Sequence, residues 1–293
     1  MKILIVGGAG YIGGALTDIL KNTNHEILVY DLLLYEEMYR KEVPFVFGDI
    51  RDYDSVYKAM KGARAVFHLA ALIGIPYSYF SPLAYIKTNI EGTYNVLESS
   101  KILNLENVVI TSTSETYGSA MYTPMDEEHR LFGQSPYAAS KIGADQLAIS
   151  YYRSFDTPVK IVRPFNTYGP RQSSRAIIPT IISQLLNGGK SIKLGNLSPT
   201  RDLTFVTDTC HGFMEIYKSD SLFGKITNIG MNEEISVGEL AEKIAKLMDK
   251  EIKIICDERR VRSDSSEVEQ LRCNNEKLLE STEWHPGYNL EKG

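Results

Sequence analysis

Two neighbouring side chains in the middle of the chain could together move a proton. Tyr137 and Lys141 are four residues apart and follow Pro136, whose fixed φ suits the first turn of a helix. Side chains four residues apart lie on the same face of a helix, so the phenol and the ammonium would be close together. A nearby positive charge favours the phenolate of a tyrosine, whose pKa is ordinarily about 10. The spacing therefore predicts a tyrosine that acts as a base.

A hydroxyl-rich segment precedes this pair. Residues 112–118, with the sequence STSETYG, follow the apolar run Asn107–Ile110, which is typical of a buried strand. The hydroxyls and Glu115 would then emerge at the carboxyl end of a strand, where ligands bind in an open α/β sheet. A Tyr and a Lys at this spacing also occur on ordinary exposed helices, and Glu115 alone could be a solvated loop residue. The strand end beside them favours a catalytic arrangement.

A glycine-rich loop follows the first predicted strand, Lys2–Val6. Gly7, Gly10 and Gly13 have the spacing GxxGxxG, and a helix is predicted directly afterwards, over Ala15–Lys21. Glycine permits the tight turn and allows the backbone to approach a pyrophosphate at the helix N-terminus. Glycine-rich turns are common, but the order strand, glycines, helix favours a dinucleotide site.

The second predicted strand, His25–Tyr30, ends at Asp31. An acidic residue about 20 residues after the glycine loop is the usual partner of the adenosine ribose. Its charge would repel a 2′-phosphate, and no arginine follows it closely, so NAD is favoured over NADP. Asp31 could instead form a turn or cap a helix, but the glycine loop before it favours the ribose role.

Four more apolar runs extend the pattern, and helices are predicted between them. They predict strands over Phe45–Ile50, Ala65–Ala71, Asn107–Ile110 and Val159–Val162. Strands that alternate with helices at this spacing are typical of a doubly wound parallel α/β sheet. Asp49 would accept a hydrogen bond from an adenine amino group or cap the next helix. His68 lies among apolar residues and is interpreted as a core histidine.

The alternation fails after Pro164. The remaining patterns predict a helix over Ala176–Asn187, strands over Ser191–Leu194 and Arg201–Asp208, and an amphipathic helix over Val237–Met248. We therefore expect residues 1–165 to form a first domain, to which a segment near 202–230 returns. Residues 166–293 would form a smaller, partly interleaved α/β lobe.

Composition excludes several classes of function. The chain has 293 residues, of which 43% are hydrophobic, and a net charge of −5, so a nucleic-acid groove is disfavoured. Cys210, Cys256 and Cys273 form no CxxC pair, which argues against a metal site or a disulfide framework and for a reducing compartment. No apolar run is long enough to span a membrane, and Lys2–Val6 is too short for a signal peptide. We expect a cytoplasmic protein.

Six motifs in one order resemble a known family. They are GGAGYIG, HLAA, STSETYG, YAASK, RPFNTYGPR and RDLTFVTD. Together they resemble the extended short-chain dehydrogenase/reductases, and within these the NAD-dependent nucleotide-sugar epimerases, dehydratases and decarboxylases. The resemblance covers nearly the whole chain. It implies a Rossmann domain that holds NAD, a C-terminal lobe that binds a nucleoside-diphosphate sugar, and a homodimer built from two helices of each subunit.

The resemblance also implies roles for individual residues. Thr113 takes the place of the catalytic Ser or Thr, Tyr137 that of the base, and Lys141 that of the cofactor-binding lysine. The implied cofactor site comprises Gly7, Gly10, Tyr11, Ile12, Gly13, Asp31, Asp49, Ile50, Leu69, Ala70, Ala71, Tyr137, Lys141 and Pro164. The implied substrate residues are Asn166, Arg201 and Arg262, with Arg171 and Arg175 as further candidates. Each arginine could instead form a surface salt bridge.

The segment Thr113-Ser114-Glu115 bears on the reaction. The 4,6-dehydratases commonly carry Thr-Asp-Glu there, where the Asp protonates the departing 6-hydroxyl and the Glu removes the proton from C5. Ser114 stands in place of that Asp, which leaves the acid open. Thr-Ser-Glu resembles the UDP-glucuronate decarboxylases and the N-acetylhexosamine 4,6-dehydratases of the legionaminic-acid type. We predict a 4,6-dehydratase; the alternatives are a UDP-glucuronate decarboxylase, a 4-epimerase or a non-catalytic NAD-binding protein.

Overall fold

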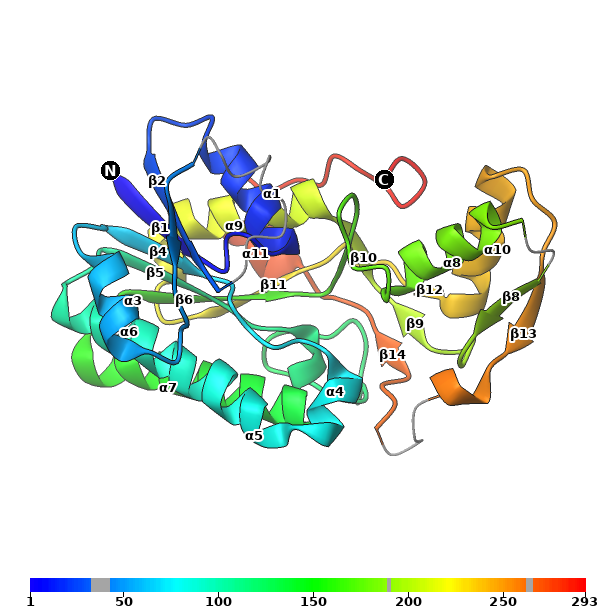
Figure 1. Cartoon of the computed structure of the whole chain (residues 1–293), viewed down its shortest axis with the longest axis horizontal. Helices are drawn as coiled ribbons and strands as arrows, with labels where there is room; N and C mark the ends of the chain where they lie inside the picture. Colours follow the sequence, from blue (N-terminus) through cyan, green and yellow to red (C-terminus); the bar gives the residue numbers. More distant parts are fainter. Residues whose placement is uncertain (33–42, 189–190, 262–265) are drawn as a thin grey trace.

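The computed structural model describes residues 1–32, 43–188, 191–261 and 266–293. Figure 1 shows a large lobe, in which helices cover both faces of a central sheet, and a smaller lobe beside it. The small lobe is built mainly from the C-terminal half of the chain. Among the described residues, the structure contains no helix that is both long and apolar enough to cross a membrane.

The central sheet has seven strands, and every pair in it is parallel. The strand order is β11-β6-β5-β4-β1-β2-β3. The strands are β1 (Lys2–Val6), β2 (Glu26–Asp31), β3 (Phe45–Phe47), β4 (Ala65–His68), β5 (Asn107–Thr111), β6 (Val159–Pro164) and β11 (Ile226–Ile229). The order reverses between β1 and β4, which is where ligands bind in such sheets. The predicted doubly wound α/β fold is confirmed.

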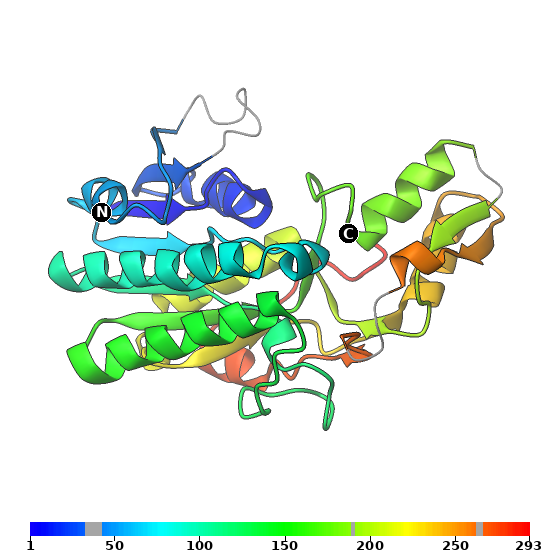
Figure 2. The same cartoon turned by 60° about the horizontal axis from the view of Figure 1, so that its bottom comes forward.

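The two faces of the sheet have separate cores because successive strand residues point to opposite sides. Ile3 and Ile5 of β1 pack with Leu16 and Phe213 on one face, while Leu4 and Val6 pack with other helices on the opposite face. The first face carries α1 (Tyr11–Leu20), α9 (Val206–Lys218) and α11 (Glu276–Ser281), with η3 (Asp220–Leu222) following α9. The second carries α3 (Tyr53–Met60), α6 (Gly92–Ile102) and α7 (Pro136–Phe155). Figure 2 shows α6 and α7 side by side, in cyan and green.

Three short helical segments lead from β4 into α6. They are α4 (Ile75–Phe80), α5 (Pro82–Tyr85) and the π-helical turn η1 (Ile86–Glu91). The turn η2 (Ser114–Thr116) follows β5 and continues towards α7. These segments lie at the carboxyl ends of the central strands, so they surround the expected ligand site.

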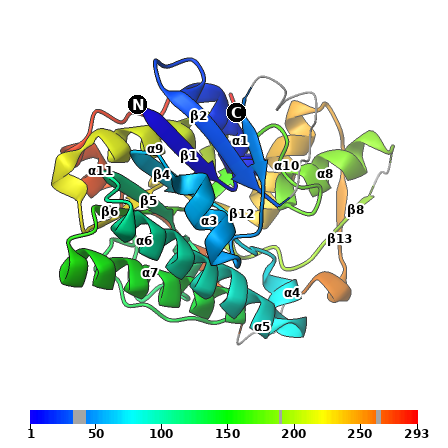
Figure 3. The same cartoon turned by 60° about the vertical axis from the view of Figure 1, so that its left-hand side comes forward.

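The small lobe contains short strand pairs and two helices around its own core. Strand β8 (Ser191–Leu194) pairs with β13 (Lys253–Cys256). In a second sheet, β9 (Thr200–Arg201) lies between β12 (Ile235–Ser236) and β14 (Gln270–Leu271). In a third, β7 (Asn166–Tyr168) pairs with β10 (Leu203–Phe205). Helices α8 (Ile177–Leu186) and α10 (Val237–Leu247) bury Ile181 and Leu240 together, and η4 (Glu258–Arg260) follows β13. Figure 3 shows this lobe on the right. The chain returns to the large sheet through α9 and β11; the division at residue 165 stays a prediction.

Several predicted boundaries are wrong: the strands Phe45–Ile50 and Ala65–Ala71 end earlier, at Phe47 and His68, and two further differences have identifiable reasons. Helix α1 begins at Tyr11, not Ala15, because the backbone of Gly14 already donates to Gly10 O. The predicted strand Arg201–Asp208 is divided into β9, β10 and the first turn of α9. Asp208 lies in that turn, where its carboxylate accepts hydrogen bonds from the backbone of Gly287 and Tyr288. Contacts with the distant C-terminal segment therefore override the local strand pattern.

Candidate active site

The start of helix α7 places Tyr137 and Lys141 in the interior. Ser135 caps the helix, since its Oγ accepts a hydrogen bond from Ala138 N at 3.1 Å, and Pro136 occupies the first turn. Tyr137 is 7% exposed and Lys141 is 4% exposed. The predicted helix and the shared face of the two side chains are therefore present, and both groups are shielded from water.

The segment after β5 meets this helix face. Thr113 Oγ1 accepts a hydrogen bond from Glu115 N at 3.3 Å and so begins the turn η2. The Thr113 side chain is also hydrogen-bonded to the Tyr137 phenol. Lys141 Nζ donates to Thr111 O at 2.5 Å. The structure thus brings Thr113, Tyr137 and Lys141 together, as the motifs predict.

Burial and nearby negative charge both disfavour the phenolate of Tyr137, and one hydrogen bond favours it. Burial raises the pKa of Tyr137, the hydrogen bond from Thr113 lowers that pKa, and the carboxylate of Glu115 raises it. Glu115 belongs to the turn η2 that Thr113 begins, so its backbone lies two residues from the hydroxyl that is bonded to the phenol. Ser114 is buried, at 3% exposure. Burial also lowers the pKa of Lys141. A base in this position needs a further positive charge nearby to favour the phenolate.

Two aromatic residues, Tyr85 and His68, lie close to Tyr137 and Lys141. The ring of Tyr85 meets the ring of Tyr137 edge to face, with centroids 6.2 Å apart, and Tyr85 Oη donates to Gly74 O at 2.5 Å. His68 is buried, and its Nε2 lies 3.0 Å from Thr93 Oγ1. Burial and the charge of Lys141 lower the pKa of His68 to about 3, so this imidazole is neutral and belongs to the core.

The glycine loop packs so closely that side chains are excluded. Gly7 has φ +86°, and a Cβ there would lie 2.4 Å from Ala70 N. A Cβ on Gly13 would lie 2.1 Å from Gly7 O. Asp31 Oδ2 accepts a hydrogen bond from Ala9 N at 3.0 Å, which ties the end of β2 to this loop. The backbone can therefore approach a pyrophosphate, so the residues present fit a dinucleotide.

The other predicted cofactor residues lie at the carboxyl ends of the central strands or directly after them. Leu69 N and Ala70 N both donate to Val6 O, at 2.7 and 3.0 Å, so the loop after β4 lies against the glycine loop. The remaining residues are Gly10, Tyr11 and Ile12 after β1, Asp49 and Ile50 after β3, Ala71 after β4, and Pro164 at the end of β6. The phenol oxygen of Tyr11 is buried and has no hydrogen-bond partner within the described parts of the chain.

The helix-capping alternative for Asp49 is wrong. Helix α3 is capped by Asp52, which accepts a hydrogen bond from Ser55 N at 3.2 Å. The carboxylate of Asp49 is instead bonded to Arg51, which lowers the pKa of Asp49. Asp49 lies three residues too early to reach the first helical amides, and an arginine two residues away is the nearer partner.

The predicted substrate residues lie in different places. Arg201 donates to Glu267 Oε1 at 3.2 Å and to Thr200 O at 2.8 Å. Arg171, with φ +70°, pairs with Asp18 of α1 at 3.1 Å. Those two arginines therefore form ion pairs within this chain, as the salt-bridge alternative allows.

Asn166 and Arg175 have features that suit a ligand. Asn166 Oδ1 is buried, and no hydrogen bond to it is present among residues 1–32, 43–188, 191–261 and 266–293. Arg175 lines a cavity of about 340 Å³ together with Ser174, Thr180, Ser183, Gln184 and Arg260. Sequence reasoning missed Arg260, because only the packing of η4 beside α8 brings it there. Arg262 lies outside the described residues.

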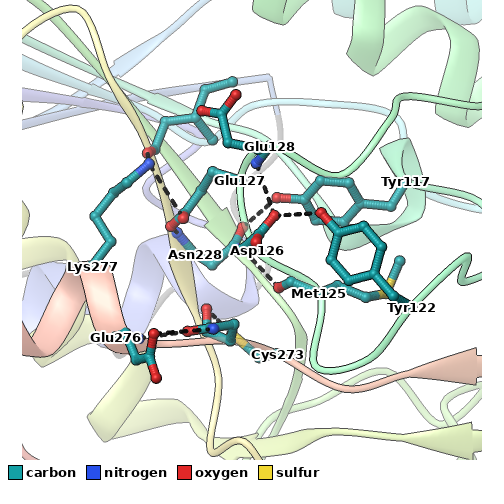
Figure 4. Close-up of polar contacts among 12 residues, drawn as sticks. Tyr117, Tyr122, Met125, Asp126, Glu127, Glu128, Asn228, Cys273, Glu276 and Lys277 are labelled. Atoms are coloured by element: carbon teal, nitrogen blue, oxygen red, sulfur yellow. Dashed lines mark hydrogen bonds and ion pairs between the residues drawn. The ribbon is translucent and has the colours of Figure 1, made fainter.

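The end of the candidate catalytic segment, at Tyr117, contacts the edge strand β11 of the large sheet. Tyr117 Oη donates to Asn228 Oδ1 at 2.7 Å, and Asn228 N donates to Glu127 Oε1 at 2.8 Å (Figure 4). Glu127 in turn pairs with Lys277 of α11 at 3.2 Å. The segment that carries Thr113 and Glu115 is therefore anchored beyond them by three distant parts of the chain.

Comparison with known proteins places the chain in a family. Residues 4–293 match the family model described as GDP-mannose 4,6-dehydratase. The chain belongs to this family.

Its relatives catalyse more than one reaction. The chain is 35% identical over 269 residues to a dTDP-D-glucose 4,6-dehydratase of Dictyostelium discoideum, covering 84% of this chain and 62% of that protein. It is 30% identical to a UDP-N-acetyl-alpha-D-glucosaminuronate decarboxylase of Bacillus cytotoxicus, covering 100% of this chain and 95% of the relative. The structure of DesIV, a dTDP-glucose 4,6-dehydratase from Streptomyces venezuelae with NAD and TYD bound, matches with a TM-score of 0.90 and 27% identity, covering 100% and 94% of the two chains. The family resemblance predicted from the motifs is confirmed, and the family includes dehydratases, decarboxylases and epimerases.

Proposed function

We propose that this protein is an NAD-dependent nucleoside-diphosphate-sugar 4,6-dehydratase, which forms a 4-keto-6-deoxy sugar. One observation carries the choice of reaction: Glu115 lies in the turn that Thr113 begins, two residues from the hydroxyl that is bonded to the Tyr137 phenol. A carboxylate at this point can serve a second proton transfer on the same sugar. The similarity to two dehydratases supports the same reaction.

The glycine loop and the residues around it would hold the cofactor. Gly7 and Gly13 allow the backbone to approach the pyrophosphate, and Asp31 would bind the adenosine ribose. NAD bound there would supply reversible hydride transfer, away from C4 of the sugar and back to C6. The NAD in the DesIV structure supports this assignment.

Three side chains would act on the sugar. Tyr137 removes the proton from the 4-hydroxyl, Thr113 shares a hydrogen bond with the reacting oxygen, and the Lys141 ammonium stabilises the phenolate. The resulting 4-ketone acidifies the hydrogen on C5, and Glu115 removes it. Ser114 is a poor acid at its ordinary pKa, so Glu115 delivers the proton to the departing 6-hydroxyl. Glu115 then takes a proton from solvent and gives it to C5 as the hydride returns to C6.

The substrate would bind between the lobes. Asn166 N donates to Asp202 O at 3.1 Å, so Asn166 lies beside the residue that follows Arg201. The side chains of Asn166 and Arg201 would both contact the diphosphate, since guanidinium groups bind phosphate oxygens well. Arg175 and Arg260 line the cavity of about 340 Å³ and would contact the nucleoside end of the molecule. The roles of Arg171 and Arg262 stay predictions.

The first experiment identifies the reaction by incubating the protein and NAD with a panel of nucleotide sugars, followed by mass spectrometry. Loss of water is the expected result.

The second experiment compares the variant Glu115→Gln with the control variant Glu106→Gln, which loses only an exposed ion pair with Arg64. In deuterated water, the Glu115→Gln variant should accumulate the 4-keto hexose without deuterium at C5. The control variant should release product normally.

Other outcomes would select an alternative. Release of carbon dioxide from UDP-glucuronate would identify a decarboxylase, which needs no base at C5 because the 4-keto acid loses carbon dioxide unaided. The decarboxylase from Bacillus cytotoxicus makes this the second candidate. An isomer of unchanged mass would identify a 4-epimerase. Absence of turnover with every sugar would favour a non-catalytic NAD-binding protein.

The outer face of α6 and α7 supports the proposal of a homodimer. Tyr94 and Ile102 of α6 and Tyr152 and Phe155 of α7 are all exposed large side chains on two adjacent helices. Pairing this face with a second copy would bury them. Sedimentation of the protein as a dimer, and of a Tyr94→Glu, Phe155→Glu variant as a monomer, would be the expected result.

The cysteines support the proposal of a cytoplasmic location. Cys210, Cys256 and Cys273 are all free thiols, and two of them are buried. Free thiols persist in a reducing compartment.

A further inference from the structure

Helix α7 carries a third ionisable side chain in series with Tyr137 and Lys141. Asp145 follows Lys141 by four residues and is completely buried. Side chains at four-residue intervals stay on nearly one face of a helix, drifting by about 40° at each step. The side chains of Tyr137, Lys141 and Asp145 therefore point, one turn after another, towards the end of the same neighbouring strand, β5.

Each of these side chains contacts one of three consecutive residues at the end of β5. The Tyr137 phenol is hydrogen-bonded to Thr113, and Lys141 Nζ donates to Thr111 O at 2.5 Å. Ser112 Oγ donates to Asp145 Oδ2 at 2.6 Å. Asp145 thus makes the third contact of a series whose other two members are the candidate catalytic pair.

A residue of the next strand secures this third contact. Arg163 of β6 donates from Nη2 to Asp145 Oδ2 at 2.6 Å and from Nε to Ser112 Oγ at 3.4 Å. The side chains of Arg163 and Asp145 are both completely buried. A buried ion pair is costly to break, because the remaining charge is left without compensation. Helix α7 is therefore fixed against the strand end by a bond that water does not weaken.

Asp145 also determines the charge around the catalytic pair. The buried groups Lys141 and Arg163 are positive and Asp145 is negative, so the three together are positive by one charge. The groups that act on the Tyr137 phenol are Thr113, Glu115, Asp145 and Tyr85, and the charged group that acts on Lys141 is Asp145. Burial and the charge of Lys141 in turn lower the pKa of the neutral His68. The carboxylate of Asp145 raises the pKa of both the phenol and the ammonium.

We propose that Asp145 is a positioning residue for proton transfer, which holds Tyr137 and Lys141 against the strand end through Ser112 and sets the charge that they experience. This inference rests on the proposed role of Tyr137 as the base. A residue with only a structural role would affect stability and leave the pH dependence of the reaction in place.

The direction of the pH effect follows from the charges. The active form has the phenol deprotonated and the ammonium protonated, so the acidic limb of the rate profile reports Tyr137 and the alkaline limb reports Lys141. Removal of the Asp145 carboxylate favours the phenolate and disfavours the ammonium, so both limbs move to lower pH. Eight residues of helix separate Tyr137 from Asp145 by about 12 Å, and one charge at that distance moves the acidic limb by about one pH unit.

The test uses the Asp145→Asn variant with NAD bound. The rate is measured against pH with the nucleotide sugar that the unmodified protein converts. The pH profile of the variant should move to lower pH by about one unit, and its maximum rate should be about 10-fold lower. Independently of any substrate, tyrosine labelled with ¹³C at the hydroxyl-bearing carbon reports the phenol by NMR, and Tyr137→Phe identifies the signal. The Tyr137 signal should titrate at lower pH in Asp145→Asn than in the unmodified protein.

Two further variants separate charge from contact. Asp145→Asn combined with Arg163→Met returns the buried net charge to one positive, so the profile should move back towards its original position. Ser112→Ala keeps the charges and removes the hydrogen bond, so the rate should fall while the profile stays in place. Asp208→Asn replaces another buried aspartate, one on α9, and should lower stability without moving the profile.

Clear results would overturn the proposal. A folded Asp145→Asn variant with an unmoved NMR titration and rate profile would show that Asp145 is structural only. If that variant does not fold, an unchanged rate in Ser112→Ala would likewise show that the contact does not position the catalytic pair. If no nucleotide sugar turns over, the proposed function fails, while the NMR titration still decides the effect of Asp145 on the phenol.

Discussion

The two lobes hold their candidate functional side chains in opposite ways. In the large lobe, Tyr137 and Lys141 are buried and bonded to the end of β5. In the small lobe, Arg201 and Arg260 pair with acidic neighbours, and the side chain of Arg260 is half exposed. The exposed Arg260 pair contributes little to stability and can be exchanged for a ligand, and the Arg201 pair is more buried, with side chains 13% and 10% exposed. The buried hydrogen bonds of the large lobe cannot be rearranged cheaply.

The sheets of the two lobes account for this difference. The seven parallel strands of the large lobe are covered on both faces, so any polar side chain on α7 that reaches β5 is enclosed. In the described part of the chain the small lobe has sheets of two or three strands, and its candidate arginines Arg201 and Arg260 belong to the short segments β9 and η4. We therefore expect substitutions in the large lobe to reduce the rate of reaction, and substitutions in the small lobe to reduce affinity.

The largest expected effect comes from the buried phenol. Tyr137→Phe removes one oxygen and leaves the ring packed against Tyr85, so folding and NAD binding should be preserved. Hydride transfer should fall by roughly 10²–10⁴-fold, as is typical when a general base is lost. Single-turnover kinetics with the identified sugar measures this rate. Turnover near the original rate would remove Tyr137 from the role of base.

The second-largest expected effect is a loss of affinity for the nucleoside diphosphate in the small lobe. Arg201→Leu removes a charged donor next to Glu267, so the nucleoside diphosphate should bind about 10–100-fold more weakly, since hydrogen bonds to charged groups contribute roughly 1.5–3 kcal/mol. The catalytic rate at saturation should change little. Calorimetry with UDP, GDP and dTDP measures the affinity, and Arg64→Leu, which loses an exposed ion pair, is the matched control. An equal loss of rate and affinity would break the contrast between the lobes.

The smallest expected effect is on the affinity for the cofactor. Asp31→Ala removes the acceptor of the Ala9 hydrogen bond and the proposed ribose ligand, so NAD should bind roughly 10-fold more weakly. The preference against NADP should also decline, because the repulsion of the 2′-phosphate is lost. Fluorescence titration with both cofactors measures this, with Asp54→Ala, an exposed residue of α3, as control. Tighter binding of NADP than of NAD by the unmodified protein would refute the role of Asp31.

The sequence by itself determined the features that depend on local patterns. The apolar runs predict the parallel strands, the glycines before Tyr11 predict the loop that excludes side chains, and Pro136 predicts the start of α7. Even the four-residue spacing from Lys141 to Asp145 is visible in the sequence. These features are local because the period of a helix or strand is set by its own backbone.

Only the tertiary structure decided which distant residues become partners. Asp145 meets Ser112 and Arg163 because β5 and β6 are neighbours beneath α7, and no spacing within the sequence encodes that contact. Arg260 reaches the cavity beside Arg175 only through the packing of η4 on α8. A charged side chain pairs with whichever opposite charge folding brings within a few ångströms, and the energy of that pairing depends on how far the same packing excludes water.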